Sequence, residues 1–144
     1  MRRSRRKPSV WASAAAVLWA GAAAGQGIEA SLTGAPGDAA RGEAIVAEPT
    51  RGLCPLCHDG PFAGDFAGTL GPDLTGVGDR LDEAELRQRI VDSRVYDPDG
   101  LMPPYYSMKG LTRVGERWAG ATLFTAEEVE DVVAYLVTLK ETGG

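Results

Sequence analysis

The residues best suited to chemistry in this chain lie within five consecutive positions. Cys54, Cys57 and His58 form the sequence C-x-x-C-H, and they are both of the cysteines and the only histidine of the chain. This spacing is the attachment signature of c-type haem, because two thiols can reach one porphyrin edge and form thioethers while the adjacent imidazole ligates the iron. The pattern predicts one covalently attached haem c, with His58 as an axial ligand.

Three alternatives use only part of this group. A structural zinc site needs four protein ligands, whereas the chain offers two cysteines and one histidine. A thioredoxin-like redox pair requires a βαβ context, and the sequence contains none. A simple disulfide accounts for the two thiols but leaves the histidine unexplained. We favour haem attachment because it uses all three residues.

The second axial ligand is expected to be a methionine, since no second histidine exists. Met102 precedes two prolines, which fix the local backbone and can hold a thioether toward the iron. Met108 lies in the less restrained sequence YSMKG. Packing in the core is the usual role of either methionine, and Lys109 or an open position are further alternatives. We expect Met102 to be the ligand.

The glycine-rich stretch GTLGPDLTGVGDR, residues 68–80, is a second candidate part of the site. Its glycines allow backbone to lie close to a flat ligand. The carbonyl oxygen of Pro72 can accept a hydrogen bond from the other ring nitrogen of His58, which would fix the tautomer of the imidazole. From the residues alone, an ordinary surface loop explains this stretch equally well.

Three helices are expected to position these residues. The first is capped by Asp38 and stops before Pro49, and the second covers 81–95 with a capping pattern of Asp82 and Glu85. The third begins with the capping box of Thr125 and Glu128 and runs toward Gly143. Its apolar stripe recurs at helical spacing and consists of Val129, Val132, Val133, Leu136 and Leu139. Residues 54–80 and 96–124 are rich in glycine and proline and show no strand alternation. Three short helices alone bury too little apolar area to fold such a domain firmly, and a large apolar ligand at the centre would supply the rest. The sequence therefore predicts an all-α fold of short helices and long loops around one haem.

The N-terminus has the pattern of a signal peptide. Residues 1–10 carry five cations and no acid, an apolar stretch follows, and Ala22 and Ala24 form a cleavage pattern. The apolar core is shorter than the ~20 residues that span a bilayer, which favours cleavage over an uncleaved anchor. We expect a cleaved leader at 1–24, a flexible N-terminal segment at 25–37 and one domain at 38–144, with no membrane span after cleavage.

Cleavage would leave a strongly acidic domain in the periplasm. The five cations of the leader depart with it, so 10 basic and 20 acidic side chains remain, a net charge of −10. Nucleic acid is not expected as a partner, because phosphate contacts need lysine and arginine. Basic protein surfaces are better suited to such a charge, although it also serves solubility.

The order of CPLCH, GPDLTGVG and MPPYY between a short first helix and a last helix containing VVAYL resembles class I cytochromes c. The resemblance implies that Pro72 faces the haem histidine and that Met102 is the distal ligand. It also implies that the first and last helices cross near Ala44 and Tyr135.

A narrower resemblance covers residues 76–140, and above all LRQRIVDSRVYDPDGLMPPYYSMKGLTRV. This part is similar to the SoxX family of monohaem subunits. The resemblance implies a SoxA-type cytochrome subunit as partner, in an L-cysteine S-thiosulfotransferase that couples thiosulfate to a carrier-protein cysteine. It also implies a downstream electron-accepting cytochrome.

No catalytic residue is assigned to this chain, because both thiols would be tied to the haem and two ligands would close the iron. Electron transfer within a complex is therefore the expected function. A free, diffusible cytochrome is the main alternative, and a redox or gas sensor a weaker one. The roles of Tyr105, Tyr106 and Trp118 stay open between a partner interface and packing in the core or against the haem.

Overall fold

The computed structural model describes residues 27–65 and 67–141, and every regular element in that part of the chain is helical. The prediction of an all-α fold with short helices and long loops is thus confirmed. In chain order the elements are α1 (Ala39–Ala47), a 3-10 turn (Cys54–Leu56), α2 (Val77–Arg80), α3 (Glu83–Asp92), two further 3-10 turns (Ser93–Val95 and Glu116–Trp118) and α4 (Ala126–Thr138). The expected leader at 1–24 lies outside the described residues.

The N-terminal caps of the three longer helices are those that the sequence predicts. The Asp38 carboxylate accepts hydrogen bonds from two backbone N–H groups of the first turn of α1. Asp82 and Glu85 form a capping box at α3, and Thr125 and Glu128 form one at α4. Each cap satisfies backbone donors that have no partner within the helix, which explains why the helices begin at these residues.

The end of the last helix differs from the expectation. α4 stops at Thr138, five residues before Gly143. The chain leaves the helix because it is held to α2 instead: the backbone N–H of Glu141 donates to Asp79 at 2.7 Å, and that of Gly78 donates to the Leu139 carbonyl at 2.9 Å. The second helix also ends earlier than expected, because the 3-10 turn Ser93–Val95 replaces the last turn of the helix predicted for 81–95. α2 and the other two 3-10 turns fall in the stretches 54–80 and 96–124, for which no helix is predicted.

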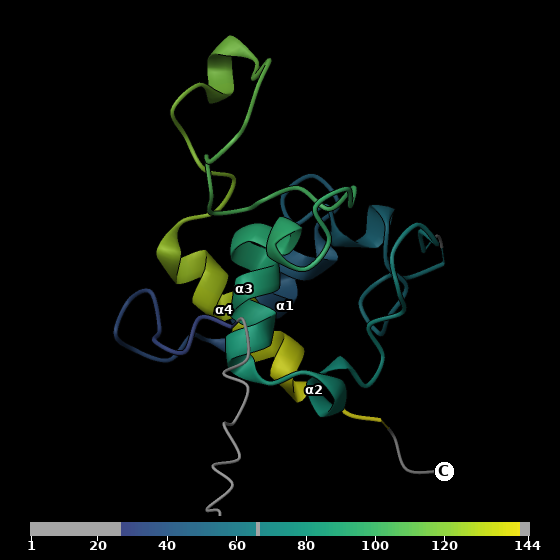
Figure 1. Cartoon of the computed structure of the whole chain (residues 1–144). Coiled ribbons are helices and arrows are strands. Elements are labelled where there is room, and N and C mark those ends of the chain that lie inside the picture. The colour runs from purple at the N-terminus through teal and green to yellow at the C-terminus, as the bar shows by residue number, and fades with distance from the viewer. Residues whose placement is uncertain (1–26, 66, 142–144) are drawn as a thin grey trace, which may run out of the picture.

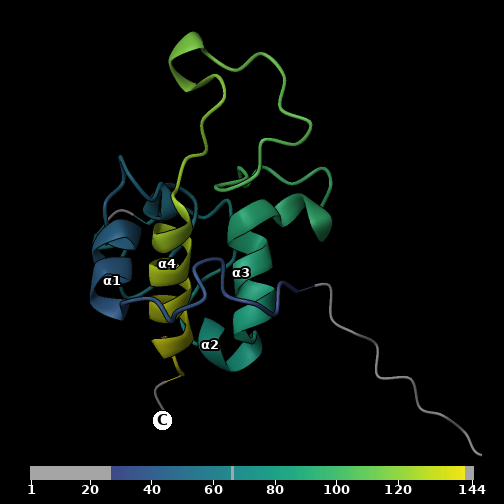
Figure 2. The same ribbon diagram turned by 90° about the vertical axis from the view of Figure 1, so that its left-hand side faces the viewer.

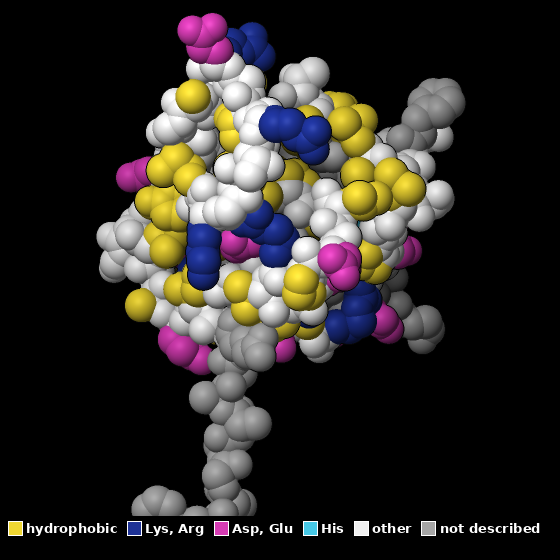
Figure 3. Space-filling view, turned by 45° about the horizontal axis from the view of Figure 1, so that its top comes forward, with side chains coloured by type: hydrophobic (Ala, Val, Ile, Leu, Met, Phe, Trp, Pro, Cys, Tyr) yellow, Lys and Arg dark blue, Asp and Glu magenta, His cyan; other side chains and the backbone are white. Residues whose placement is uncertain are grey.

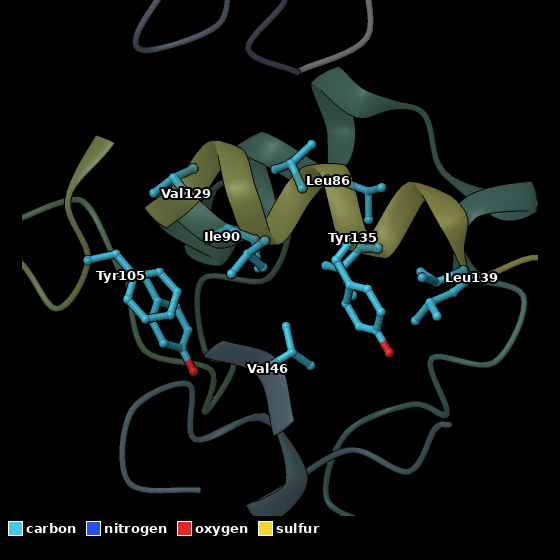
Figure 4. Close-up of a cluster of buried hydrophobic side chains, with 12 residues drawn as sticks. Val46, Leu86, Ile90, Tyr105, Val129, Tyr135 and Leu139 are labelled. Carbon is cyan, nitrogen blue, oxygen red and sulfur yellow. The ribbon is translucent and has the colours of Figure 1, made fainter. Parts of the chain in front are cut away.

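Helix α4 lies between α1 and α3 (Figure 2). Its apolar stripe is almost completely buried, and α1 and α3 supply the facing side chains (Figure 4). The buried core consists of Val46, Val77, Leu86, Ile90, Tyr105, Phe124, Val129, Val132, Val133, Tyr135, Leu136 and Leu139. The stripe that periodicity predicts for the last helix is therefore the centre of the core.

Contact between α1 and α4 is closest at Gly42, not at Ala44. A Cβ atom on Gly42 would lie 1.9 Å from the Asp131 carbonyl oxygen and 2.9 Å from Cβ of Tyr135. Ala44 is exposed. The two helices do cross at buried Tyr135, but the small residue that permits the close approach is one half-turn earlier on α1.

Residues 27–37 contain no helix, and they contact α3 and α4. The backbone N–H of Ile28 donates to the Ala84 carbonyl at 3.0 Å, and that of Leu32 donates to the Glu130 carboxylate at 2.9 Å. Glu130 is buried in a bidentate ion pair with Arg87, whose guanidinium also donates to the Ile28 carbonyl. A buried pair needs its remaining hydrogen bonds satisfied, and this segment supplies them. These hydrogen bonds join residues 28 and 32 to α3 and α4.

None of the helices within the described residues has the length and apolar character needed to cross a bilayer.

Candidate functional site

The C-x-x-C-H residues form a single tight turn after α1. The N–H groups of Cys57 and His58 both donate to the Cys54 carbonyl, at 3.1 and 2.9 Å. Pro55 is buried at the start of this 3-10 turn, where its missing N–H costs nothing. The bond from His58 to Cys54 closes an α-helical turn, and positions i, i+3 and i+4 of an α-helix lie on one face. The local fold therefore presents both thiols and the imidazole on the same side.

The imidazole of His58 is held by the loop that follows the turn. Its Nδ1 lies 2.8 Å from the Pro72 carbonyl oxygen. Because a carbonyl oxygen can only accept, Nδ1 carries the proton, and the lone pair of Nε2 is free to ligate a metal. The contact that the sequence suggests between Pro72 and His58 is present.

The backbone of Gly71 forms the floor beneath this ring. A Cβ atom there would lie 2.3 Å from Cε1 and 2.5 Å from Nδ1 of His58, so only glycine fits. The loop is tied to the turn by backbone hydrogen bonds from Gly68 to Pro55 (2.9 Å) and from Gly71 to Cys57 (2.7 Å). The His58 ring is thereby packed against the Gly71 backbone in one orientation. An ordinary surface loop would need no such close fit.

The two thiols are free, and Cys54 does not resemble a redox nucleophile. Cys54 and Cys57 are partly exposed and are not joined in a disulfide. Burial raises the pKa of the Cys54 thiol to about 11. A reactive cysteine of a redox motif has a lowered pKa, because the thiolate is its active form. Cys54 is therefore a protonated thiol at neutral pH, unlike the nucleophile of a thioredoxin-like pair.

Tyr105 links the methionine-bearing segment to the cysteine turn. Its hydroxyl donates to the Gly52 carbonyl at 2.6 Å, and the Cys54 Sγ lies 3.3 Å from the same oxygen. The Tyr105 ring is buried and packs on Phe124 with centroids 4.5 Å apart. Burial also raises the pKa of Tyr105, so its hydroxyl stays a donor. Of the three aromatic residues left open by the sequence, Tyr105 belongs to the core and Trp118 is exposed.

The two methionines occupy different environments. Met102 is half-buried, packs against the core, and has its carbonyl oxygen held by the buried Ser93 hydroxyl at 3.1 Å. Met108 is 52 % exposed and lines an open cavity with Arg51, Tyr106 and residues 120–125. The backbone at Met102 is fixed, in keeping with the two prolines that follow. Met108 lacks this restraint.

A family comparison accounts for these features together. The family model described as cytochrome c matches residues 39–140, which include the turn, the glycine loop and all four helices. The chain belongs to the cytochrome c family. No curated protein matches it.

One solved structure makes the assignment narrower. The chain is similar to a chain in the "Crystal structure of SoxXA from P. pantotrophus", with 39 % identity and a TM-score of 0.73. The alignment covers 80 % of this cytochrome and 90 % of that chain. The cytochrome is thus of the SoxX type, as the resemblance in the sequence implies.

Membership of this family implies covalent haem c, and the residues present fit it. Two free thiols and an imidazole share one face of a turn, and the imidazole has its Nε2 lone pair available. The glycine beneath the ring leaves no room for a side chain. An imidazole is also a common iron ligand in haem proteins.

Sequence reasoning missed two supporting residues. Tyr105 was left without a role, and nothing local distinguishes it from Tyr106. No motif indicates Arg51, yet it donates to the Leu123 carbonyl, pairs with Glu128 and has its guanidinium 5.0 Å from the centroid of the Phe124 ring. Its position three residues before Cys54 was the one available signal. Both residues join the cysteine turn to the start of α4.

Proposed function

We propose that this protein is a periplasmic monohaem cytochrome c that serves as the electron-transfer subunit of a SoxAX-type complex. One observation carries the proposal: the cysteines share a turn with a histidine whose Nδ1 is bound to Pro72 and whose ring rests on Gly71. This arrangement orients an imidazole for permanent iron ligation. The proposed complex couples thiosulfate to a cysteine of a carrier protein and passes electrons to a further cytochrome.

Five residues would hold the single haem c, which supplies one-electron redox chemistry. Cys54 and Cys57 would form the thioethers, and His58 would be the proximal ligand. Met102 would be the distal ligand, because its segment is fixed by Ser93 and tied to the cysteine turn through Tyr105. Pro72 would orient the imidazole by accepting its Nδ1–H, an outer contact that raises the basicity of the ligating nitrogen.

Chemistry on thiosulfate would belong to the partner. Once both cysteines are used as thioethers, this chain has no thiol left to carry sulfur. Histidine and methionine would close both faces of the iron, so substrate would find no metal position. The solved SoxXA structure supports a SoxA-type subunit as the partner that supplies the bond-forming site. A free cytochrome serving several partners is the second candidate, favoured only by the general cytochrome c fold.

Export is the remaining element of the proposal. Residues 1–24 have the pattern of a cleaved signal peptide, and cytochromes with covalent haem need reduced thiols only until attachment. Mass spectrometry of the periplasmic protein would report the cleavage position and one covalently bound haem. A haem that acidic organic solvent removes from the denatured protein would contradict the thioether assignment.

The experiment that tests the function separates the subunit from the free carrier. The holoprotein is purified alone and with a SoxA-type subunit, and thiosulfate-dependent reduction of its haem is followed in the presence of the carrier protein. We expect rapid reduction only in the two-protein complex. Rapid reduction of the isolated holoprotein would contradict the subunit assignment, as would failure to bind a SoxA-type subunit at micromolar concentration.

A further inference from the structure

A run of 14 residues projects from the body of the molecule. Residues 108–121, called here the projecting arm, are exposed without exception. They extend away from the helices and carry the short turn Glu116–Trp118 at their far end (Figures 1 and 2). Added Cβ atoms on Gly115 or Gly120 would meet no heavy atom within 4 Å. The arm therefore lies in open solvent.

The arm is fixed only at its base. Arg94, held by two 2.7 Å hydrogen bonds to Asp92, donates to the Lys109 carbonyl at 2.8 Å. At the other end the Phe124 N–H donates to the Tyr105 carbonyl at 2.9 Å. Between residues 110 and 121 the hydrogen bonds that the structure describes all join residues of the arm itself. Contacts with the body thus fix the base of the arm, whereas no other described part of the chain covers its far end.

Large apolar side chains are concentrated on the arm. Eight large hydrophobic residues are exposed in the described part of the chain, and four of them lie here: Met108, Leu111, Val114 and Trp118, which are 39–52 % exposed. On the face from which the arm projects, hydrophobic and basic side chains lie close together (Figure 3). Large apolar side chains that gather on one exposed segment mark an interaction site, and tryptophan is enriched where binding energy is concentrated.

The charge of the arm is opposite to that of the body. The arm contains three basic residues, Lys109, Arg113 and Arg117, and one acidic residue, Glu116, so its net charge is +2. The rest of the chain from residue 27 has seven basic and 19 acidic side chains. Six of those seven basic residues form ion pairs with carboxylates, whereas none of the eight ion pairs of the described residues involves a cation of the arm. The arm cations are therefore available to a partner.

We propose that the projecting arm is the element that docks onto the SoxA-type subunit, in an apolar groove bordered by carboxylates. This inference rests on the proposed function. Trp118 would fill the groove, and Arg113 and Arg117 would pair with its acidic border. The arm begins six residues after Met102, and Met108 and Tyr106 line a cavity of about 600 Å³ at its base. A partner seated there would lie beside the segment that carries the proposed distal ligand, as electron transfer requires.

Two other occupants fit the arm less well. An anionic lipid surface would attract three cations by only about 1 kcal/mol each, and the acidic body would be repelled from it. A second copy of this chain could receive the arm on its acidic body, but such a contact is head-to-tail and builds open filaments unless it closes into a ring. A local acidic groove on a different protein avoids both difficulties.

The test compares the binding of holoprotein variants to a purified SoxA-type subunit by isothermal titration calorimetry. Trp118→Ala and the triple variant Lys109→Glu, Arg113→Glu, Arg117→Glu should each raise Kd roughly tenfold or more. Val95→Ala is the matched control, because Val95 is 47 % exposed but lies on the body. Salt should weaken wild-type binding, and the triple variant should show the reverse dependence, because salt screens the repulsion between its carboxylates and the acidic border. Haem absorption and the unfolding temperature should match the wild type in every variant.

Each other outcome has a definite meaning. If the wild type binds and Trp118→Ala binds within twofold of it, the docking role of the arm is wrong while the proposed function stands. If the wild type does not bind a SoxA-type subunit at all, both proposals fall. Trp118-dependent self-association in the ultracentrifuge, or Trp118-dependent sedimentation with phosphatidylglycerol vesicles, would overturn the assignment of the partner if SoxA binding were unaffected.

Discussion

The site depends on a few atoms whose roles follow from hydrogen-bonding capacity. A carbonyl oxygen at Pro72 forces the proton of His58 onto Nδ1, and a missing Cβ at Gly71 lets the ring lie flat. At the proposed distal ligand, the Ser93 hydroxyl fixes the Met102 backbone by donating to its carbonyl oxygen. The orientation of both proposed ligands is thus determined by neighbours that would not themselves touch a metal.

Met102→Ala in the holoprotein should abolish the far-red charge-transfer band of a thioether–iron bond and lower the reduction potential. The reason is that a thioether is a weak donor that favours the reduced iron, and its loss removes that preference. Met108→Ala is the control and should retain the band, since Met108 is half exposed and lacks the backbone restraint. Loss of the band in Met108→Ala alone would transfer the ligand role to Met108.

At the scale of elements, the crossing of α1 and α4 is what places the cysteine turn. α1 ends at Ala47, seven residues before Cys54, so any displacement of α1 from α4 moves the turn. Gly42 sets the separation of the two helices, because its Cα faces the Asp131 carbonyl. The Asp131 carboxylate also accepts hydrogen bonds from the Arg41 guanidinium at 2.7 Å and from the Asp38 N–H at 2.6 Å. These bonds join the start of α1 to α4.

Gly42→Ala should destabilise the holoprotein by about 1–3 kcal/mol, the usual cost of overpacking. At an exposed position in the interior of a helix, a change from glycine to alanine would instead stabilise the protein by up to about 1 kcal/mol. The sign of the change in unfolding free energy therefore shows whether α1 and α4 are in close contact at Gly42. The free energy of unfolding is measured by guanidinium titration with circular dichroism. Glu43→Ala, on the exposed side of the same turn, should change it by less than about 0.5 kcal/mol. A stabilising Gly42→Ala would show that the helices are not in close contact there.

The molecule as a whole is acidic, and several of its carboxylates, among them Asp92 and Asp131, are bound to arginines. The Arg94 guanidinium, hydrogen-bonded to both oxygens of Asp92, lowers the pKa of that carboxyl from 3.8 to about 2. The hydrogen bond from Arg41 likewise lowers the pKa of Asp131. A carboxyl with a lowered pKa stabilises the fold at pH values above its ordinary pKa, and this contribution is lost as pH falls toward the folded pKa.

The holoprotein should therefore lose stability as pH falls from about 4 to about 2, and Asp92→Asn should remove part of that dependence. At pH 7 the variant should be less stable by about 1–2 kcal/mol, and the difference should narrow by roughly half near pH 3. Denaturant titrations at pH 7, 4 and 3 measure the difference. Asp99→Asn, in an exposed loop, should run parallel to the wild type. A difference that does not change with pH would show that Asp92 acts by packing and not by charge.

Local patterns in the sequence are sufficient for much of the fold and for the identity of the site. The capping residues at Asp38, Asp82 and Thr125 determine helix starts because each cap acts within one turn of chain. The valine stripe of α4 predicts its buried face for the same reason. The C-x-x-C-H pattern predicts haem attachment because all of its residues lie in one turn. Ligation by His58 and Met102 stays a prediction.

What the sequence by itself determined about this protein is thus its helical class, its cofactor chemistry and its family. Only the tertiary structure decided which residues meet across long stretches of chain: Gly42 against Asp131, Tyr105 against Gly52, and Glu130 between Arg87 and residue 32. It also decided that residues 27–37 are held to the body and that residues 108–121 are not. The physical reason is that caps and motifs act between neighbours in the sequence, whereas burial and ion pairing depend on partners that only the folded chain brings together.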